Sequence, residues 1–172
     1  MCIRDSIEAA APTLIANGKD AHGRVVAVAS AAGRTGLYHL AAYSAAKHAV
    51  VGLIRGTAMD LAPYGVTANA VSPGSTRTAL LDASAQVYEL SSAEEFAQQQ
   101  PIDRLIEPVE IAAAISWLCS PAASAITGAD VAVDGGMTLS LIHILSRRVH
   151  GGEVLHRPRD ERSRPGMRVR SR

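Results

Sequence analysis

The hydrophobic positions of this chain fall into short continuous runs and longer segments with helical spacing. In the first run, Arg24–Ser30, Val and Ala fill the interior without alternating with polar residues. A strand that is buried on both faces has this pattern, and such strands belong to parallel sheets. We therefore predict strands at about residues 24–30, 66–71 and 129–133.

Two of the longer segments predict well-defined helices. One covers about residues 41–61 and ends before Pro63, and the other covers residues 108–119, with a proline at its first turn. The second helix is strongly apolar, so we expect Trp117 and Cys119 to be buried.

The remaining segments have weaker helical patterns. Residues 7–18 are expected to form a helix that stops at Asn17-Gly18, since Asn-Gly is a typical C-terminal helix signal. Residues 78–90 and 93–100 are mixed and polar, and we expect two short helices there, forming an excursion over the edge of the sheet.

A strand, a helix and a second parallel strand form a right-handed crossover unit. The predicted fold class is therefore α/β, with a doubly wound parallel sheet. Catalytic groups in such sheets gather beyond the carboxyl ends of the strands. This rule brings Ser30, Tyr43 and Ser72-Pro73-Gly74 to one crevice.

Tyr43 and Lys47 are the residues in this crevice with the clearest chemistry. They lie four residues apart in a predicted helix, so both side chains share one face. A lysine ammonium beside a phenol favours the phenolate, which suits proton exchange. Taken singly, Ser30 fits a turn residue and Tyr43 a packing residue, and Lys47 fits a solvated helix lysine.

Charge divides the chain sharply. Residues 1–139 carry 8 Lys and Arg against 13 Asp and Glu, a net of −5, whereas residues 140–172 carry 9 Arg against 3 acids, a net of +6. A basic tail can bind nucleic acid. This tail lacks lysine and has no aromatic residue for stacking on bases, so we expect disordered or non-native sequence instead.

Both ends of the chain resemble translated sequencing-adapter read-through. We expect residues 1–6 to be non-native, residues 7–138 to form the domain, and residues 139–172 to be a non-native or disordered Arg-rich tail. No apolar run approaches the length of a membrane span, and no signal peptide is visible. The two cysteines have no spacing typical of a disulfide framework, and no ligand spacing indicates a metal, so we expect a cytoplasmic protein.

Several ordered motifs resemble those of the short-chain dehydrogenases/reductases. The resemblance covers residues 7–138 and includes the thirteen-residue separation of Ser30 from Tyr43. It rests on Ala29-Ser30-Ala31-Ala32-Gly33, Tyr43-Ser44-Ala45-Ala46-Lys47, Asn69-Ala70-Val71-Ser72-Pro73-Gly74 and Asp134-Gly135-Gly136. It implies part of a Rossmann-like fold, namely its C-terminal half.

The resemblance also implies NAD(P)-dependent hydride transfer between a secondary alcohol and a ketone. Tyr43 would be the general acid/base, Lys47 would ease loss of its proton and bind the nicotinamide ribose, and Ser30 would polarise the substrate carbonyl. The loop that holds the nicotinamide and its phosphates would contain Pro73, Gly74, Thr76 and Thr78. Asn69 matches a position that usually supports this loop.

Other features of the family are missing from this sequence. No G-x-x-x-G-x-G motif occurs, the residue that separates NAD from NADP is absent, and the fourth catalytic residue, an asparagine, would fall near Ile3. We therefore expect a fragment that keeps the acid/base but lacks most of the dinucleotide site. An inactive interaction module of the same fold is the alternative.

The substrate and the subgroup stay open on the sequence. Residues 72–76 are similar to dihydrodiol dehydrogenases, and residues 107–121 are similar to mycofactocin-associated members. The family implies a homo-dimer or homo-tetramer for the full-length protein, assembled partly through the helix that carries Tyr43.

Overall fold

The computed structural model describes residues 3–21 and 23–139, with only the backbone described for residues 18–21. The predicted tail beyond Leu139 lies outside the described residues. The strands are β1 (Arg24–Val28), β2 (Thr67–Pro73) and β3 (Asp130–Val133). The α-helices are α1 (Ile3–Ala21), α2 (Ala41–Leu61), α3 (Ala79–Val87) and α4 (Pro108–Cys119), and the 3-10 turns are η1 (Ala31–Gly33), η2 (Ala62–Tyr64), η3 (Ala93–Gln99) and η4 (Pro121–Ala123).

The three strands form one parallel sheet in the order β1-β2-β3. β2 lies in the middle, where Arg24 pairs with Thr67 on one side and Asp130 pairs with Ala70 on the other. The first six residues of β2 are buried, as expected of a central parallel strand. The predicted α/β class and the parallel crossover are confirmed.

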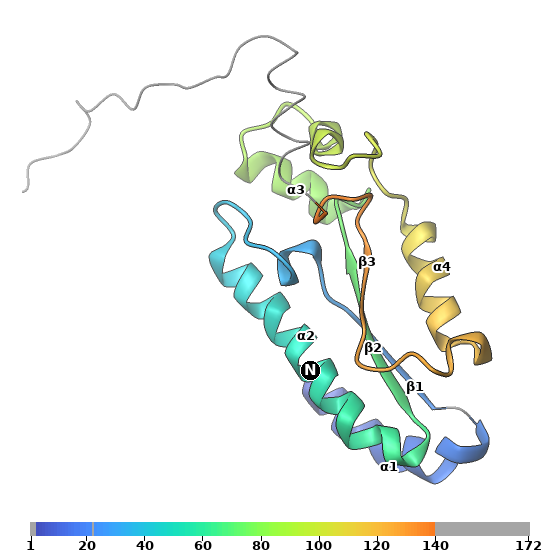
Figure 1. The fold of residues 1–172 in the computed structure, drawn as a ribbon. Coiled ribbons are helices and arrows are strands. Elements are labelled where there is room, and N and C mark those ends of the chain that lie inside the picture. The colour runs from blue at the N-terminus through green and yellow to red at the C-terminus, as the bar shows by residue number, and fades with distance from the viewer. Residues whose placement is uncertain (1–2, 22, 140–172) are drawn as a thin grey trace, which may run out of the picture.

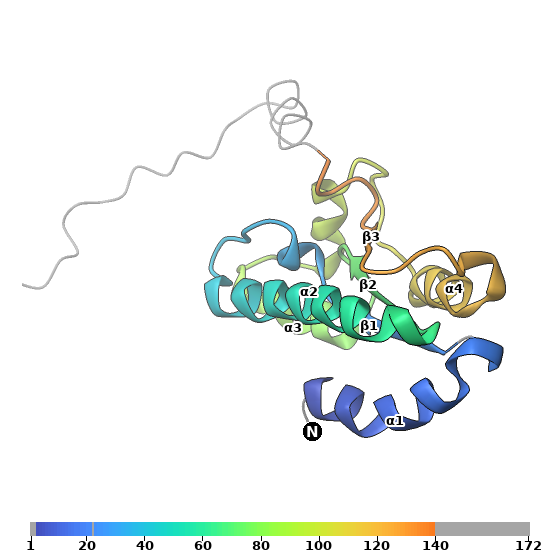
Figure 2. The same cartoon turned by 60° about the horizontal axis from the view of Figure 1, so that its bottom comes forward.

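Helices cover both faces of this sheet. α2 and α4 flank the strands in Figure 1, and Figure 2 shows α1 beside α2 and away from α4. Successive residues of β1 point to opposite faces, so Ala27 joins the core beneath α1 and α2 while Val26 joins the core beneath α4. The unbroken apolar run of β1 thus serves two cores.

A third, smaller core lies in the excursion between β2 and α4. Ala85 of α3 packs with Phe96 of η3 and with Leu105. The predicted helices are shorter than expected here, and residues 93–99 form a 3-10 helix instead of an α-helix.

Several element boundaries differ from the predicted ones. β2, for example, continues two residues past its predicted end, to Pro73. α1 continues past Asn17-Gly18 to Ala21, and the Asn17 side chain donates a hydrogen bond to the Thr13 carbonyl oxygen within the helix, at 2.9 Å. β1 ends at Val28 and not at Ser30, because Ser30 caps η1.

The expected burial of Trp117 and Cys119 is also wrong. Trp117 is 46% exposed and Cys119 is exposed. α4 places Ile111, Ile115 and Leu118 against the sheet, so its other side faces outward.

Candidate active site

The carboxyl ends of the strands lead into one cluster of turns. Figure 1 shows η1, the start of α2 and α3 at the same end of the sheet. The predicted site residues lie on these turns, so the topology brings both groups of them to one end of the molecule.

Ser30 leaves β1 with extended backbone, at φ −176° and ψ 159°. Its Oγ accepts a hydrogen bond from the Ala32 N–H, at 3.1 Å, and so caps η1. At the end of this turn, a Cβ atom on Gly33 would lie 2.9 Å from the Lys47 carbonyl oxygen. Only a glycine lets the turn approach the backbone of α2 this closely. The contact is at Lys47, whose side chain carries the ammonium.

Lys47 connects the start of α2 to the end of β1. Its Nζ donates a hydrogen bond to the Val28 carbonyl oxygen, at 3.2 Å, and lies 5.6 Å from the centroid of the Tyr43 ring. This distance is within the range of a cation–π contact. The Tyr43 side chain is 37% exposed, so its ring is open to a ligand.

Ser30 is placed next to this pair through the backbone. Among the residues that the structure describes, Ser30 and Tyr43 make no hydrogen bond with each other, whereas Gly33 and Lys47 are in close contact. The structure therefore pairs Tyr43 with Lys47 directly and brings in Ser30 by way of η1.

The second group of predicted residues surrounds the end of β2. Pro73 is the last residue of that strand, and the Gly74 N–H donates to the Val133 carbonyl oxygen at 3.1 Å. The Thr76 hydroxyl donates to the Gly74 carbonyl oxygen at 3.1 Å, and Thr78 caps α3 by accepting from the Leu81 N–H at 3.3 Å. The loop is thus closed by its own side chains.

These donors suit one end of a dinucleotide. A lysine ammonium, two threonine hydroxyls and the N–H groups at the start of α3 are groups that bind ribose hydroxyls and phosphate oxygens. The sequence supplies no Gly-rich turn for the pyrophosphate.

Asn69 does not support this loop, contrary to expectation. Its Nδ2 donates to the Ile126 carbonyl oxygen at 2.8 Å, and its Oδ1 accepts from the Ala129 N–H at 3.0 Å. Asn69 lies near the amino end of β2, so its side chain reaches the segment that enters β3 and not the loop beyond Pro73.

Two buried side chains, Gln100 and Asp134, organise the backbone next to this loop. Gln100 is 1% exposed, and its Nε2 donates to the carbonyl oxygens of Ser75, at 3.2 Å, and Arg104, at 2.7 Å. The Asp134 carboxylate accepts from the N–H groups of Gly136, at 2.9 Å, and Thr138, at 3.0 Å. Asp134 belonged to a recognised motif, but nothing in the local sequence indicated Gln100.

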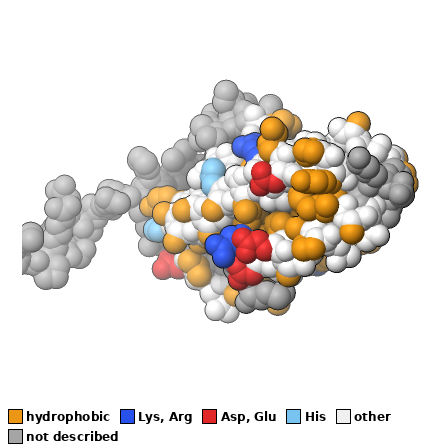
Figure 3. Space-filling model, turned by 90° about the horizontal axis from the view of Figure 1, so that it is seen from below, with side chains coloured by type: hydrophobic (Ala, Val, Ile, Leu, Met, Phe, Trp, Pro, Cys, Tyr) orange, Lys and Arg blue, Asp and Glu red, His pale blue; other side chains and the backbone are white. Residues whose placement is uncertain are grey.

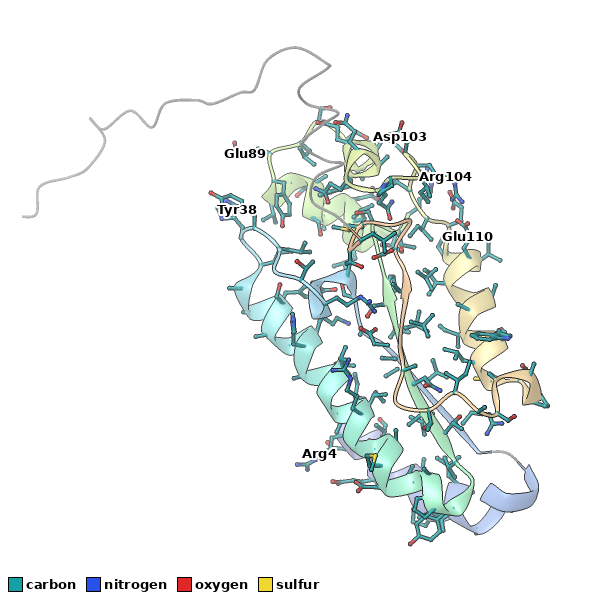
Figure 4. The ribbon with its side chains drawn as sticks, viewed as in Figure 1. Arg4, Tyr38, Glu89, Asp103, Arg104 and Glu110 are labelled. Atoms are coloured by element: carbon teal, nitrogen blue, oxygen red, sulfur yellow. The ribbon has the colours of Figure 1, made fainter. Side chains whose placement is uncertain are left out.

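Aromatic side chains join the loop before α2 to α3. The Tyr88 hydroxyl donates to the Tyr38 carbonyl oxygen at 2.5 Å, and the His39 ring lies 4.0 Å from the Tyr38 ring and 6.4 Å from the Tyr88 ring. Burial raises the pKa of Tyr88. Figure 4 shows Tyr38 at the tip of this loop. These contacts hold the loop before α2 against the end of α3.

Ion pairs fasten the excursion on its outer side. Arg77 pairs with Glu94 and, at 2.9 Å, with Glu107. These hydrogen bonds raise the pKa of Arg77, and the bond from Arg77 lowers the pKa of Glu94. The Arg104 guanidinium pairs with Glu110 at the start of α4, at 2.7 Å (Figure 4).

No group of three or more His, Cys, Asp or Glu among the described residues could hold a metal ion. Within the same ranges, no helix is long and apolar enough to cross a membrane.

Known proteins resemble this chain in sequence. A family model described as "Enoyl-(Acyl carrier protein) reductase" matches residues 5–138. An A-factor type gamma-butyrolactone 1'-reductase of Streptomyces virginiae is 39% identical, and the match covers 80% of this chain and 51% of that protein. A 2,5-dichloro-2,5-cyclohexadiene-1,4-diol dehydrogenase of Sphingobium indicum is 44% identical, covering 67% of this chain and 46% of its own. The chain spans about half the length of the curated relatives it matches.

Solved structures agree with this result. Levodione reductase superposes with a TM-score of 0.72 at 36% identity, covering 78% of this chain and 52% of its own. Actinorhodin polyketide ketoreductase with NADPH has a TM-score of 0.69 at 32% identity, and a Brucella melitensis 3-ketoacyl-(acyl-carrier-protein) reductase with NADH has 0.67 at 32%. The matched regions make up 52% and 51% of these two structures, and 78% and 77% of this chain. By sequence and by fold, this chain belongs to the short-chain dehydrogenase/reductase family.

Proposed function

We propose that the protein containing this chain transfers a hydride between NAD or NADP and a secondary alcohol or ketone. The observation that carries the proposal is the position of the Lys47 ammonium. It lies 5.6 Å from the Tyr43 ring and is fixed by the Val28 carbonyl at 3.2 Å. A positive charge held beside an exposed phenol is what a tyrosine acid/base requires.

Each residue has a separate task in this proposal. In ketone reduction, Tyr43 gives its hydroxyl proton to the substrate oxygen, and Lys47 stabilises the negative charge that remains on the phenolate. The Ser30 hydroxyl donates to the same substrate oxygen as charge develops on it. When bound, the nicotinamide supplies the hydride. In alcohol oxidation, the proton and the hydride move in the opposite direction.

The loop after β2 would hold the nicotinamide end of the cofactor. Pro73 and Gly74 would line its ring, and the hydroxyls of Thr76 and Thr78 would turn from their present carbonyl partners toward its phosphates. Lys47 would also donate to the ribose. The proposal covers both NAD and NADP, since solved relatives hold NADPH or NADH.

Exposed apolar surface supports assembly of the full-length protein as a dimer or tetramer. Met59 on α2 is 78% exposed and Tyr64 beyond it is 44% exposed. Figure 3 shows many hydrophobic side chains on one face, with some acidic and basic groups between them. Exposed apolar patches of this kind commonly become interfaces. A cytoplasmic location completes the proposal.

Expression of the complete reading frame that encodes this chain tests the function. Oxidation of NADH and NADPH should be followed with a keto-lactone, and reduction of NAD and NADP should be followed with a cyclic diol, because these substrates match the names of the relatives. Turnover with either cofactor supports the proposal, and the absence of turnover with intact folding and bound cofactor contradicts it.

Cofactor binding distinguishes the proposed enzyme from the alternative, an inactive interaction module. The 172-residue chain lacks a Gly-rich motif, so titration with NADH and NADPH compares it with the complete reading frame. Binding that appears only in the longer protein supports the enzyme. A complete protein that binds neither dinucleotide supports the module.

A further inference from the structure

One carboxylate joins three segments of the chain at the edge of the proposed site. Asp130, the first residue of β3, accepts a hydrogen bond from Arg34 Nη1 at its Oδ2, at 2.9 Å, and another at its backbone carbonyl oxygen, at 2.8 Å. Its Oδ1 accepts from the Ser72 hydroxyl of β2, at 2.6 Å. We call Arg34, Asp130 and Ser72 the Asp130 bridge.

The carboxylate and the serine of the bridge are shielded from water, whereas the arginine is partly exposed. Ser72 is fully buried, the Asp130 side chain is 8% exposed and the Arg34 side chain is 34% exposed. A carboxylate in such a place is stable only when charged or polar donors satisfy it. Both of its oxygens are satisfied here, so the bridge has one preferred geometry.

Each end of the bridge leads directly to a predicted site residue. Arg34 closes η1, the turn that Ser30 opens, and its own N–H donates to the Ala31 carbonyl oxygen at 3.0 Å. At the other end, Ser72 stands two residues before Gly74 in the loop proposed for the cofactor.

η1 is therefore held on two sides. On one side Gly33 lies against the backbone of Lys47, and on the other side Arg34 is anchored to Asp130. Contact with α2 alone limits how close the turn can come, whereas the ion pair limits how far it can move away. A hydroxyl that stabilises developing charge must be held to within a fraction of an ångström.

We infer that Arg34 and Asp130 are positioning residues. They set the Ser30 turn and the cofactor loop in register with each other through a single carboxylate. The effect on catalysis rests on the proposed function, but the effect on the turn does not.

Amide hydrogen exchange of the 172-residue chain tests the positioning without any need for activity. Arg34→Ala should speed exchange of the Ala32 and Gly33 amides about tenfold or more, because a charge-assisted bond is lost. Ser72→Ala should instead speed exchange at Gly74. Asp130→Asn should affect both places, and Arg34→Lys should restore part of the protection.

The matched control is Arg104→Gln, which breaks an exposed ion pair of similar length, Arg104 to Glu110 at 2.7 Å. It should leave exchange at Ala32 and Gly33 unchanged. Unaltered exchange at Ala32 in both Arg34→Ala and Asp130→Asn would overturn the inference. Uniformly faster exchange across β1 and α2 would also overturn it, since that result indicates general destabilisation.

In the complete reading frame, Arg34→Ala should lower kcat about 10- to 100-fold while NADH or NADPH binding stays close to wild type. Asp130→Asn should lower kcat and also weaken cofactor binding. If the wild-type protein shows no turnover but the exchange pattern is as predicted, the proposed function is contradicted and the positioning role is supported. Normal kcat in Arg34→Ala would contradict the inferred effect of the bridge on catalysis and would leave the proposed function intact.

Discussion

Gly74 and Asp134 approach each other so closely that neither segment can move without the other. A Cβ atom on Gly74 would lie 2.8 Å from the Asp134 Cα atom and 2.9 Å from its carbonyl oxygen, and it would also meet the Gln100 amide oxygen. Asp134 cannot easily yield, because its carboxylate holds the N–H groups of Gly136 and Thr138. The proposed cofactor loop and the Asp134 turn therefore form one packed unit.

Gly74→Ala should lower the free energy of unfolding by about 1–3 kcal/mol, because the added methyl overpacks a site closed by backbone. Urea denaturation of the purified chain measures this change. Gly52→Ala is the control, since nothing lies within 4 Å of a Cβ there and the residue is inside α2. It should be neutral or stabilising by up to about 1 kcal/mol. Equal stability of Gly74→Ala and wild type would show that the Asp134 turn shifts freely.

Tyr43→Phe should reduce turnover of the complete reading frame by about 10²- to 10⁴-fold, because the proton donor is lost. The ring and its contact with Lys47 remain, so binding of NADH or NADPH should stay near the wild-type value. Steady-state kinetics and a fluorescence titration measure the two effects. Turnover close to wild type would refute Tyr43 as the acid/base.

Lys47→Met should reduce turnover and also weaken cofactor binding, unlike Tyr43→Phe. The substitution removes the ammonium beside the Tyr43 ring and the hydrogen bond to the Val28 carbonyl. We expect a loss of about tenfold or more in each quantity, as for other hydrogen bonds to charged groups. Lys47→Arg is the comparison, because it keeps the charge but not the compact donor. A Lys47→Met protein that binds the cofactor normally would remove Lys47 from the cofactor site.

Acid should destabilise the excursion through Glu110. Hydrogen bonds from the Arg104 side chain, and then from the Glu107 N–H, lower the pKa of Glu110 from 4.5 to about 2. A carboxylate with a lowered pKa stabilises the folded state above its unfolded pKa and loses this effect as pH falls through the folded value. Melting temperature should thus fall between about pH 4.5 and pH 2. Glu110→Gln should flatten part of this decline, and an unchanged slope would show that Glu110 does not contribute to it.

Leu118→Ala should cost about 2–5 kcal/mol of stability, because Leu118 is fully buried against the sheet and would leave a cavity. Val109→Ala on the same helix is the control. Val109 is 70% exposed, so its loss should change stability by less than about 0.5 kcal/mol. Thermal and urea denaturation distinguish the two variants. Similar losses for both would mean that α4 packs by a different face.

Local patterns predicted much of this architecture. α2 and α4 have the predicted bounds, because a proline or a sharp loss of helical spacing marks each end within a few residues of sequence. The strand-helix-strand order also predicted that Ser30, Tyr43 and Gly74 would lie at one end of the sheet, since the carboxyl ends of parallel strands share one edge.

The errors have a different physical origin. Asn17-Gly18 lies inside α1, and Trp117 faces outward. The exposure of Trp117 depends on which side of α4 packs against the sheet, which local spacing does not encode. The partners of Asn69 were misjudged for the same reason, since they lie 57 and 60 residues away along the chain.

The sequence by itself determined the parallel α/β plan, the helix face shared by Tyr43 and Lys47, and the family motifs, all of which depend on residues close together in the chain. Only the tertiary structure decided that Arg34 would meet Asp130, 96 residues away, and that Gly74 would lie against Asp134. Those contacts depend on how the strands and turns pack in space. No local periodicity specifies that packing.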